Sequence, residues 1–373
     1  MKIARITATP VKLPRDIESA TGTAGSPTVL SAGHQPYRWS EVFPCLYSSQ
    51  FETALVRVET DDGLIGWGEA QAPLAPEVAC SIIDVLLAPV LVGEEFDGSP
   101  LRITELWDRM YSTMRVRGQT GGFMIDAISS IDIALWDIAG KLAGCSVARL
   151  IAAAPKTQVP AYLSGIRRGS TDTQGFTKVK LFYDTATPEE FFAHLDSIQA
   201  EIAVDALWRH TPDSALAFGR ELDRRGVGWF EAPLAPEDPV AHSILARQLK
   251  TPIAIGESYR TRFEMAAFFR EMALGIFQPD LGRCGITEGL RMAAQAEKRG
   301  VPVIPHISIA FGPQLAAALQ FAAATEACVL AEYNPAVLSV ANRFLAAPVR
   351  LEGSSYVVPD APGLGIELVN LPW

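Results

Sequence analysis

Residues 252–280, PIAIGESYRTRFEMAAFFREMALGIFQPD, contain two short β-rich runs separated by one helical stretch. The runs Pro252–Glu257 and Gly275–Asp280 each end in an acidic residue, and Arg262–Met272 between them has the apolar spacing of a helix. A strand, a helix and a second strand in this order form a parallel βαβ unit whose helix packs on the sheet.

The same alternation extends from about residue 158 to residue 333. Eight strands are expected in all, at Val159–Ser164, Lys178–Phe182, Ile202–Ala206, Gly228–Ala232, Pro252–Glu257, Gly275–Asp280, Pro302–His306 and Cys328–Tyr333. Helices are expected at Glu189–Ala200, Pro212–Arg225, Arg262–Met272, Thr287–Arg299 and Pro313–Ala324. Eight such repeats favour a closed α/β barrel over a doubly wound sheet.

The first 125 residues have a different pattern. Residues 2–13 and Glu52–Thr60 alternate apolar with polar side chains, and Asp61-Asp62-Gly63 predicts a hairpin turn before Leu64–Glu69. Helical spacing follows at Pro76–Leu91, Leu101–Met114 and Met124–Leu142. We therefore predict an α+β domain over residues 1–125, completed by a segment at about 345–373, and a barrel domain over residues 126–344.

Composition limits the possible functions. The chain has 373 residues, 49% of them hydrophobic, and a net charge of −10, which indicates a folded protein that does not bind nucleic acid or anionic membranes. Its five cysteines are far apart and form no Cys-x-x-Cys pair, as is typical of a protein in the reducing cytoplasm. The N-terminus lacks the apolar segment of a signal peptide, and no run approaches the ~20 apolar residues of a membrane span.

Six of the expected strands each end in an ionisable residue, at intervals of 23 to 26 positions. These residues are Asp205, Glu231, Glu257, Asp280, His306 and Glu332. An acid at one strand end is often a helix cap, but in a barrel all six strand ends open onto the same mouth, where active sites of this fold lie. Three adjacent carboxylates repel one another unless a cation neutralises them, and oxygen ligands suit Mg²⁺. We therefore predict a Mg²⁺ site at Asp205, Glu231 and Glu257.

Asp280 and His306 end neighbouring strands, so a carboxylate–imidazole pair is expected. The carboxylate fixes the tautomer of the imidazole and raises its basicity. A base beside Mg²⁺ suggests removal of the proton α to a carboxylate, because the resulting dianion needs concentrated positive charge.

Six longer motifs occur along the chain. They are Gly63-Leu-Ile-Gly-Trp-Gly-Glu69, Ala127-Ile-Ser-Ser-Ile-Asp-Ile-Ala-Leu-Trp-Asp137, Trp229-Phe-Glu-Ala-Pro233, Ile255-Gly-Glu-Ser258, Gln278-Pro-Asp-Leu-Gly-Arg283 and Val303-Ile-Pro-His306. Together they resemble the mandelate racemase and muconate-lactonizing enzyme group of the enolase superfamily. The resemblance covers nearly the whole chain. It implies an α+β capping domain over a (β/α)7β barrel of TIM type, and a homo-oligomer, either a dimer or an octamer. It also implies metal ligands at the three carboxylates, an Asp280–His306 dyad, and Glu332 as a hydrogen-bond partner of the substrate carboxylate.

The chain departs from the family at the second barrel strand. Two-base members carry Lys-x-Lys at the end of this strand, whereas here it reads Gly175-Phe-Thr-Lys-Val-Lys-Leu-Phe-Tyr183. Alignment on Gly175-Phe176 places Lys180 at the first lysine and Phe182 at the second, so that the second acid/base is missing. An alternative register uses Lys178-Val179-Lys180 as the Lys-x-Lys and makes Lys178 a residue of the site.

Three further residues are candidate substrate contacts. The family's Asp-x-Asn after the third strand is Asp205-Ala-Leu207 here, followed by Trp208-Arg-His-Thr-Pro212. The Arg-His-Thr-Pro212 ending of this segment is similar to that of the mannonate dehydratase-like members, which suggests Arg209 and His210 as substrate contacts. A solvated loop is an equal alternative for both residues. The long segment Ala20–Trp39 carries His34, which is expected to contact a distal hydroxyl or act as an acid.

The resemblance and its departures together suggest an acid-sugar dehydratase. Without an opposing lysine, racemisation by two bases is disfavoured, while His306 alone could remove the α-proton and then protonate a leaving β-hydroxyl on the same face. Lys180 remains as a cation beside the substrate carboxylate. The expected reaction is Mg²⁺-dependent, passes through a metal-stabilised enediolate and yields a 2-keto-3-deoxy acid. A racemase or epimerase of a carboxylate, and a catalytically silent binding barrel, are the alternatives.

Overall fold

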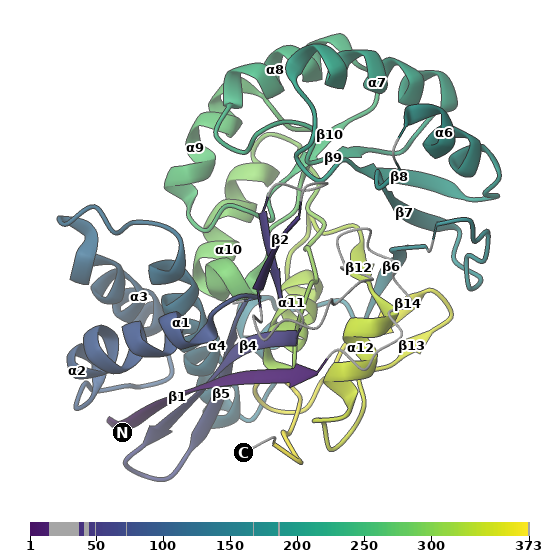
Figure 1. The fold of residues 1–373 in the computed structure, drawn as a ribbon. Coiled ribbons are helices and arrows are strands. Elements are labelled where there is room, and N and C mark those ends of the chain that lie inside the picture. Colours follow the sequence, from purple (N-terminus) through teal and green to yellow (C-terminus); the bar gives the residue numbers. More distant parts are fainter. Residues whose placement is uncertain are drawn as a thin grey trace.

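The computed structural model describes residues 1–14, 37–40, 45–48, 50–71, 73–166, 168–185 and 187–371. Within these ranges the chain forms an N-terminal sheet flanked by helices, followed by a barrel of parallel strands with helices on its outside (Figure 1). His34 lies outside the described residues.

The N-terminal sheet is antiparallel, in the order β1 (Ile3–Pro14), β4 (Gln50–Thr60), β5 (Ile65–Ala70). The predicted turn joins β4 to β5, and Gly63 within it has a φ of 90°, a left-handed value that glycine adopts without steric cost. A separate hairpin, β2 (Tyr37–Ser40) with β3 (Cys45–Ser48), extends from this domain toward the barrel strands (Figure 1).

The helix α4 packs on this sheet and also on the barrel helix α10. The N-terminal helical segments are α1 (Pro76–Ile82), the π-helical turn η1 (Ile83–Leu87), α2 (Ala88–Leu91), α3 (Pro100–Arg115), α4 (Phe123–Ala143) and α5 (Val147–Ile151). The contact between α4 and β5 is close, because a Cβ on Gly66 or Gly68 would collide with a backbone carbonyl of α4. Residue 126, the predicted start of the barrel domain, therefore falls inside a helix that contacts both parts of the molecule.

The barrel strands are parallel and close into a ring. The strands are β6 (Gln158–Ser164), β7 (Lys178–Phe182), β8 (Glu201–Asp205), β9 (Phe230–Glu231), β10 (Ile253–Ile255), β11 (Ile276–Phe277) and β12 (Ala331–Tyr333). Adjacent strands pair from β6 to β11, and β12 pairs with β6. Bridges from Phe277 to Val303 and from Val303 to Cys328 complete the ring, so the expected strand Pro302–His306 is present as isolated bridges. The expected fold class is confirmed.

Helices alternate with the strands and cover the outside of the barrel (Figure 1). They are α6 (Pro188–Asp196), α7 (Pro212–Arg225), α8 (Pro239–Gln248), α9 (Arg262–Glu271), α10 (Leu281–Glu297), α11 (Pro313–Ala324) and α12 (Pro335–Asn342). Helices α7 and α11 have the predicted bounds. Helix α10 begins six residues before the predicted Thr287. The Asp280 side chain caps the helix by accepting a hydrogen bond from the Gly282 N–H, and a kink at Gly285 interrupts the helical spacing of the apolar residues.

The C-terminal segment contacts both parts of the molecule. Strands β13 (Leu351–Glu352) and β14 (Ser355–Val357) form a hairpin that extends β6 in antiparallel fashion. Farther on, Gly363 accepts a hydrogen bond from Val147 and Leu364 donates one to Asp137 of α4.

An apolar layer fills the barrel interior below the strand ends. It consists of Tyr162, Ala203, Trp229, Ala254, Ile276, Ile304 and Leu330, one residue from each of seven strand positions around the ring. The register of β7 and β8 pairs Lys180 with Ala203, so the eighth strand contributes a buried charge at this level. Such side-chain layers fill the interior of the barrel, so a functional site can form only at the mouth, where the strands end.

Candidate active site at the barrel mouth

The structure brings together the six ionisable residues expected at the strand ends. Asp205 and Glu231 are register partners at the ends of β8 and β9, and Glu257 follows the neighbouring strand β10 by two residues. Across the ring Asp280 bridges His306. The sixth, Glu332, lies in β12.

Lys180 is the cation at the centre of the carboxylates. Its Nζ lies 2.6 Å from Glu231 Oε1, 3.1 Å from Glu332 Oε1 and 3.7 Å from Asp205 Oδ2. Burial alone would lower the pKa of Lys180, but Glu231 and Glu332 raise it well above its ordinary value. The lysine is therefore a permanent buried cation that joins three strand ends.

The carboxylates also act on one another. Burial raises the pKa of Asp205 well above its ordinary value, and the charges of Glu231 and Glu257 add to this rise while Lys180 opposes it. Burial likewise works to raise the pKa of Glu332, but Lys180 and His306 outweigh it and lower that pKa to about 2. The site therefore has more negative charge than its own lysine and histidine neutralise.

His306 and Asp280 form the predicted dyad. Asp280 Oδ2 lies 2.8 Å from His306 Nδ1, while His306 Nε2 lies 3.1 Å from Glu257 Oε2 and 4.0 Å from Glu332 Oε2. Burial tends to lower the pKa of His306, but Glu257, Glu332 and the bond to Asp280 raise it to about 10. The Nε2 atom thus faces the carboxylate cluster, and Nδ1, on the other side of the ring, is hydrogen-bonded to Asp280.

Glu332 connects the lysine to the segment that carries His306. Its Oε2 accepts a hydrogen bond of 3.0 Å from the Ile307 backbone N–H, and its Oε1 lies beside Lys180. The side chain is buried, and the Tyr356 hydroxyl donates to its backbone carbonyl. Both oxygens of this carboxylate therefore contact the protein.

Three expected substrate contacts lie apart from this cluster. Lys178 is at the opposite end of β7 and pairs with Glu201. His210 stacks on Tyr183, its Nδ1 lies 3.1 Å from Ser214 Oγ, and burial lowers its pKa to about 4. Arg209 covers the same tyrosine ring at 4.7 Å and donates to the Tyr183 carbonyl. These two residues join the loops that follow β7 and β8.

Phe182, not a lysine, is at the mouth end of β7. The register pairs it with Asp205, and it lies on the same side of the strand as Lys180, whose Nζ is 5.5 Å from its ring centroid. The residue at the level of the carboxylates on this strand is therefore apolar.

Sequence reasoning missed two aromatic residues at the mouth. Trp208 Nε1 donates to Glu257 Oε1 at 3.1 Å. Tyr47, from the β2–β3 hairpin, lies within electrostatic reach of Asp205 and Glu257, since burial, Cys45 and these two carboxylates all raise its pKa. The positive φ values of 54° at Leu207 and 60° at Trp208 are a conformation that no motif in the sequence predicts.

The donor set at Asp205, Glu231 and Glu257 has the chemistry of a Mg²⁺ site. Within the described ranges no three His, Cys, Asp or Glu side chains are already arranged around one point as metal ligands, because Glu231 is directed at Lys180 and Glu257 at His306. The three carboxylates nevertheless lie at the ends of consecutive neighbouring strands, and burial together with the charges of Glu231 and Glu257 raises the pKa of Asp205. A hard divalent cation with oxygen ligands would remove that repulsion.

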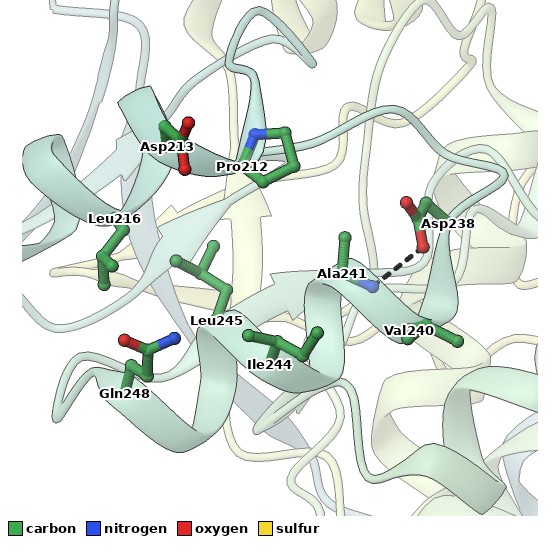
Figure 2. Close-up of a pocket in the computed structure, with 9 residues that line it drawn as sticks. All are labelled: Pro212, Asp213, Leu216, Asp238, Val240, Ala241, Ile244, Leu245 and Gln248. Atoms are coloured by element: carbon green, nitrogen blue, oxygen red, sulfur yellow. Dashed lines mark hydrogen bonds between the residues drawn. The ribbon is translucent and has the colours of Figure 1, made fainter.

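A separate surface cavity lies between α7 and α8 on the outside of the barrel (Figure 2). It has a volume of about 260 Å³ and is lined by residues of these two helices and the turns before them, among them Pro212, Leu216 and Ile244. No ionisable residue of the strand-end cluster lines it. It is therefore not the site formed by the strand ends.

Comparison with known proteins identifies the family. Residues 45–152 match the mandelate racemase / muconate lactonizing enzyme N-terminal domain, and residues 167–370 match the enolase C-terminal domain-like family. The chain belongs to the enolase superfamily. The predicted resemblance to its mandelate racemase and muconate-lactonizing enzyme group is confirmed.

Several members of this superfamily are similar over most of the chain. D-galactarolactone cycloisomerase of Agrobacterium fabrum is 31% identical, over 84% of this chain and 88% of that protein. Arabinonate dehydratase of Saccharolobus solfataricus is also 31% identical, over 84% and 87% respectively. A crystal structure of a putative isomerase from Sinorhizobium meliloti superposes with a TM-score of 0.91 at 33% identity, over 99% of this chain and 98% of that one.

None of the helices in the described part of the chain is both long and apolar enough to cross a bilayer.

Proposed function

We propose that this protein is a Mg²⁺-dependent dehydratase of sugar acids that yields a 2-keto-3-deoxy acid. The observation that carries the proposal is the arrangement of the mouth. The His306–Asp280 dyad lies beside three carboxylates that suit Mg²⁺, while Phe182 occupies the position of β7 where a second base would be needed. Arabinonate and D-galactonate dehydratases are among the similar proteins, at 31% and 29% identity.

The metal and the cations around it would hold the substrate carboxylate. Asp205, Glu231 and Glu257 would bind Mg²⁺, which supplies Lewis-acid stabilisation of the negative charge that develops on the carboxylate. Lys180 adds a fixed positive charge beside Glu231, and Glu332 contacts the same lysine ammonium. In this proposal Lys178, Arg209 and His210 support the barrel rather than contact the substrate.

The proton transfers centre on His306 Nε2, which must be unprotonated to act as the base. Mg²⁺ on Glu257 would offset the charge that contributes most to the raised pKa of His306. Nε2 accepts the proton from the α-carbon, and the electron pair of the broken C–H bond moves into the carboxylate to form an enediolate. The pair then returns, the bond from the β-carbon to its hydroxyl breaks, and the proton on Nε2 passes to the leaving oxygen, which departs as water. The resulting enol tautomerises to the 2-keto-3-deoxy acid. Asp280 holds Nδ1 throughout and stabilises the imidazolium.

A lactone cycloisomerase is the second candidate function. It is favoured by the similarity to D-galactarolactone cycloisomerase. The same proton abstraction on a lactone whose ring oxygen is bonded to the carbon β to the carboxylate would break that carbon–oxygen bond, open the ring and expel no water. The product would then have the mass of the substrate, so the two candidates differ by one measurable water.

The test is mass spectrometry of a library of sugar acids and their lactones, incubated in D₂O with Mg²⁺ and the protein. We expect loss of water from one or a few acids, and no turnover by His306→Asn. His194→Asn serves as the control, because His194 Nε2 lies 2.8 Å from the carbonyl oxygen of Ser170, away from the cluster. Ring opening without water loss would replace the dehydratase with the cycloisomerase. Deuterium uptake at the α-carbon with inversion and no water loss would support a racemase.

We further propose that the protein is cytoplasmic and forms a homo-oligomer, a dimer or an octamer. Light scattering on the purified protein would give a single mass of two or eight chains.

A further inference from the structure

The two oxygens of the Asp280 carboxylate have different partners. Oδ2 contacts His306 Nδ1, whereas Oδ1 accepts hydrogen bonds from the Gly282 backbone N–H at 2.9 Å and from Gln314 Nε2 at 3.2 Å. Asp280 is fully buried. The contacts on Oδ1 therefore determine where Oδ2, and with it the imidazole, can lie.

Gln314 is held in one orientation by its surroundings. It lies in the first turn of α11 and is 1% exposed. Its Oε1 has no hydrogen-bond partner among the described residues, so the bond to Asp280 is the side-chain interaction that fixes the amide. Gly282 leaves space for it, because a Cβ there would collide with the Gln314 amide and lie 2.8 Å from the Gln71 Cβ.

The N-terminal domain fixes the backbone of Gln314. Glu69, at the end of the Gly66-Trp-Gly-Glu69 segment of β5, accepts backbone N–H bonds from Phe311 at 2.6 Å, Gly312 at 3.2 Å and Gln314 at 3.1 Å. Thr53 of β4 donates to the same carboxylate at 2.9 Å. One side chain of the N-terminal sheet thus caps the start of α11.

The other donor to Asp280 is held from the same domain. The Gly282 carbonyl accepts hydrogen bonds from the Gln71 backbone N–H at 2.9 Å and from the Ser129 hydroxyl of α4 at 2.5 Å. Both donors to Oδ1 therefore belong to the barrel but are anchored by residues of the N-terminal domain.

We infer that Gln314 is a positioning residue for the Asp280–His306 dyad, with Glu69 of the N-terminal domain fixing the start of its helix. The inference rests on the proposed role of His306 as the base. Without the Gln314 bond, Oδ1 keeps the Gly282 N–H as its donor but loses the second one, so the Asp280 carboxylate is less restrained about its terminal torsion and Oδ2 fixes the imidazole plane less well. Loss of such a supporting contact typically lowers activity by about 10- to 100-fold, because small misplacements of a reacting group are costly.

The test compares Gln314→Met with Gln320→Met. Gln320 is a buried glutamine on the same helix, and its amide bonds Ala148, Pro359 and Leu364, far along the helix from the dyad. We expect Gln314→Met to lower kcat about 10- to 100-fold with KM changed by less than about threefold. Gln320→Met should lose thermal stability and keep the wild-type kcat.

A second readout does not depend on turnover. In protein labelled with ¹⁵N at histidine, the His306 Nδ1–H resonance is the one that His306→Asn removes. We expect it to shift or broaden in Gln314→Met and to stay in place in Gln320→Met. Gln314→Leu, which also lacks the amide donor, should give the same change if Gln314→Met does not fold.

An unchanged His306 resonance together with wild-type kcat in Gln314→Met would overturn the inference, as would equal effects of the two methionine variants. If no library compound reacts, the proposed function fails. The NMR comparison would still show whether Gln314 orients the dyad.

Discussion

Lys180 carries a charge that no neighbouring group can replace. Its ammonium contacts Glu231, Glu332 and Asp205, and all four side chains are buried. Removal of one partner from a buried ion pair typically costs about 3–5 kcal/mol, because the remaining charges stay desolvated. We expect Lys180→Met to lose about that much free energy of unfolding in metal-free buffer, measured by urea denaturation.

Lys178→Met is the matched control for this prediction. It is a lysine on the same strand, but it pairs with Glu201 at an exposed position. Exposed pairs contribute roughly 0–1 kcal/mol. A loss at Lys180 no larger than the loss at Lys178 would contradict the view that Lys180 is the central cation of the site. We also expect added Mg²⁺ to stabilise Lys180→Met more than Lys178→Met, because the cation neutralises carboxylates that have lost their lysine.

At the residue scale, spacing predicted the strand-end cluster but could not predict rotamers. Asp205, Glu231, Asp280 and His306 meet because parallel strands of equal repeat end at one mouth. The direction of each side chain depends on which charges are nearest, which is a three-dimensional property. This is why His210, equally polar in the sequence, packs against Tyr183 instead of joining the strand-end carboxylates.

At the scale of elements, the turn after β8 is strained and supports Glu257, one of the proposed metal ligands. Leu207 and Trp208 have consecutive left-handed φ values, which non-glycine residues adopt at some energetic cost. Two hydrogen bonds hold the turn: the Leu207 N–H donates to the Asp205 carboxylate, and the Trp208 N–H donates to the Ala232 carbonyl. In this conformation the Trp208 indole N–H donates to Glu257. The strained turn therefore holds the side chains of Asp205 and Glu257, which belong to two different strand ends.

Trp208→Phe keeps the ring and removes the indole donor to Glu257. We expect about a 10-fold weaker affinity for Mg²⁺, because a carboxylate ligand without its supporting hydrogen bond is less well oriented. Calorimetric titration of metal-free protein with Mg²⁺ would measure this. Trp107→Phe is the control: Trp107 is buried in the N-terminal helices and stacks on Tyr111, so it should leave the affinity unchanged. Equal affinities in wild type and Trp208→Phe would refute the supporting role.

Element boundaries followed the sequence where caps are local. Helix α7 begins at its predicted residue because Thr211 caps it and Pro212 takes the first position. It ends at Arg225 because the next residue, Gly226, adopts a left-handed conformation. The start of α10 could not be predicted, because its cap is Asp280, a residue that also serves the dyad. The strand expected at Pro302–His306 is reduced to bridges, which depend on ring closure rather than on local propensity.

At the scale of the whole molecule, the two domains share buried carboxylates. Glu69 joins the N-terminal sheet to α11, and Asp132 of α4 accepts hydrogen bonds from the Thr287 backbone N–H, at 2.9 Å, and the Thr287 hydroxyl of α10. Such contacts span about 150 or more positions in the sequence, so motif spacing could not reveal them. They explain why acids outside the mouth are fully buried.

The buried Asp132 should make the stability of the molecule depend on pH. Burial raises its pKa from 3.8 to about 7, although the bonds from Thr287 work in the opposite direction. Between these two values the folded state holds a proton that the unfolded state has lost, so the free energy of unfolding falls as the pH rises. The contribution is fully present below pH 3.8 and is lost by about pH 7.

Asp132→Asn removes the titrating group and keeps an amide that can bond Thr287. Urea unfolding at pH 5, 6, 7 and 8 should show a shallower decline for this variant than for the wild type. The difference in slope should be at most about 1.4 kcal/mol per pH unit, and it should vanish above pH 7, where the aspartate is ionised in both states. Parallel curves from pH 5 to 7 would mean that Asp132 is already ionised in the folded protein. In that case the Thr287 hydrogen bonds would outweigh burial, and the contact between α4 and α10 would carry a stable buried charge.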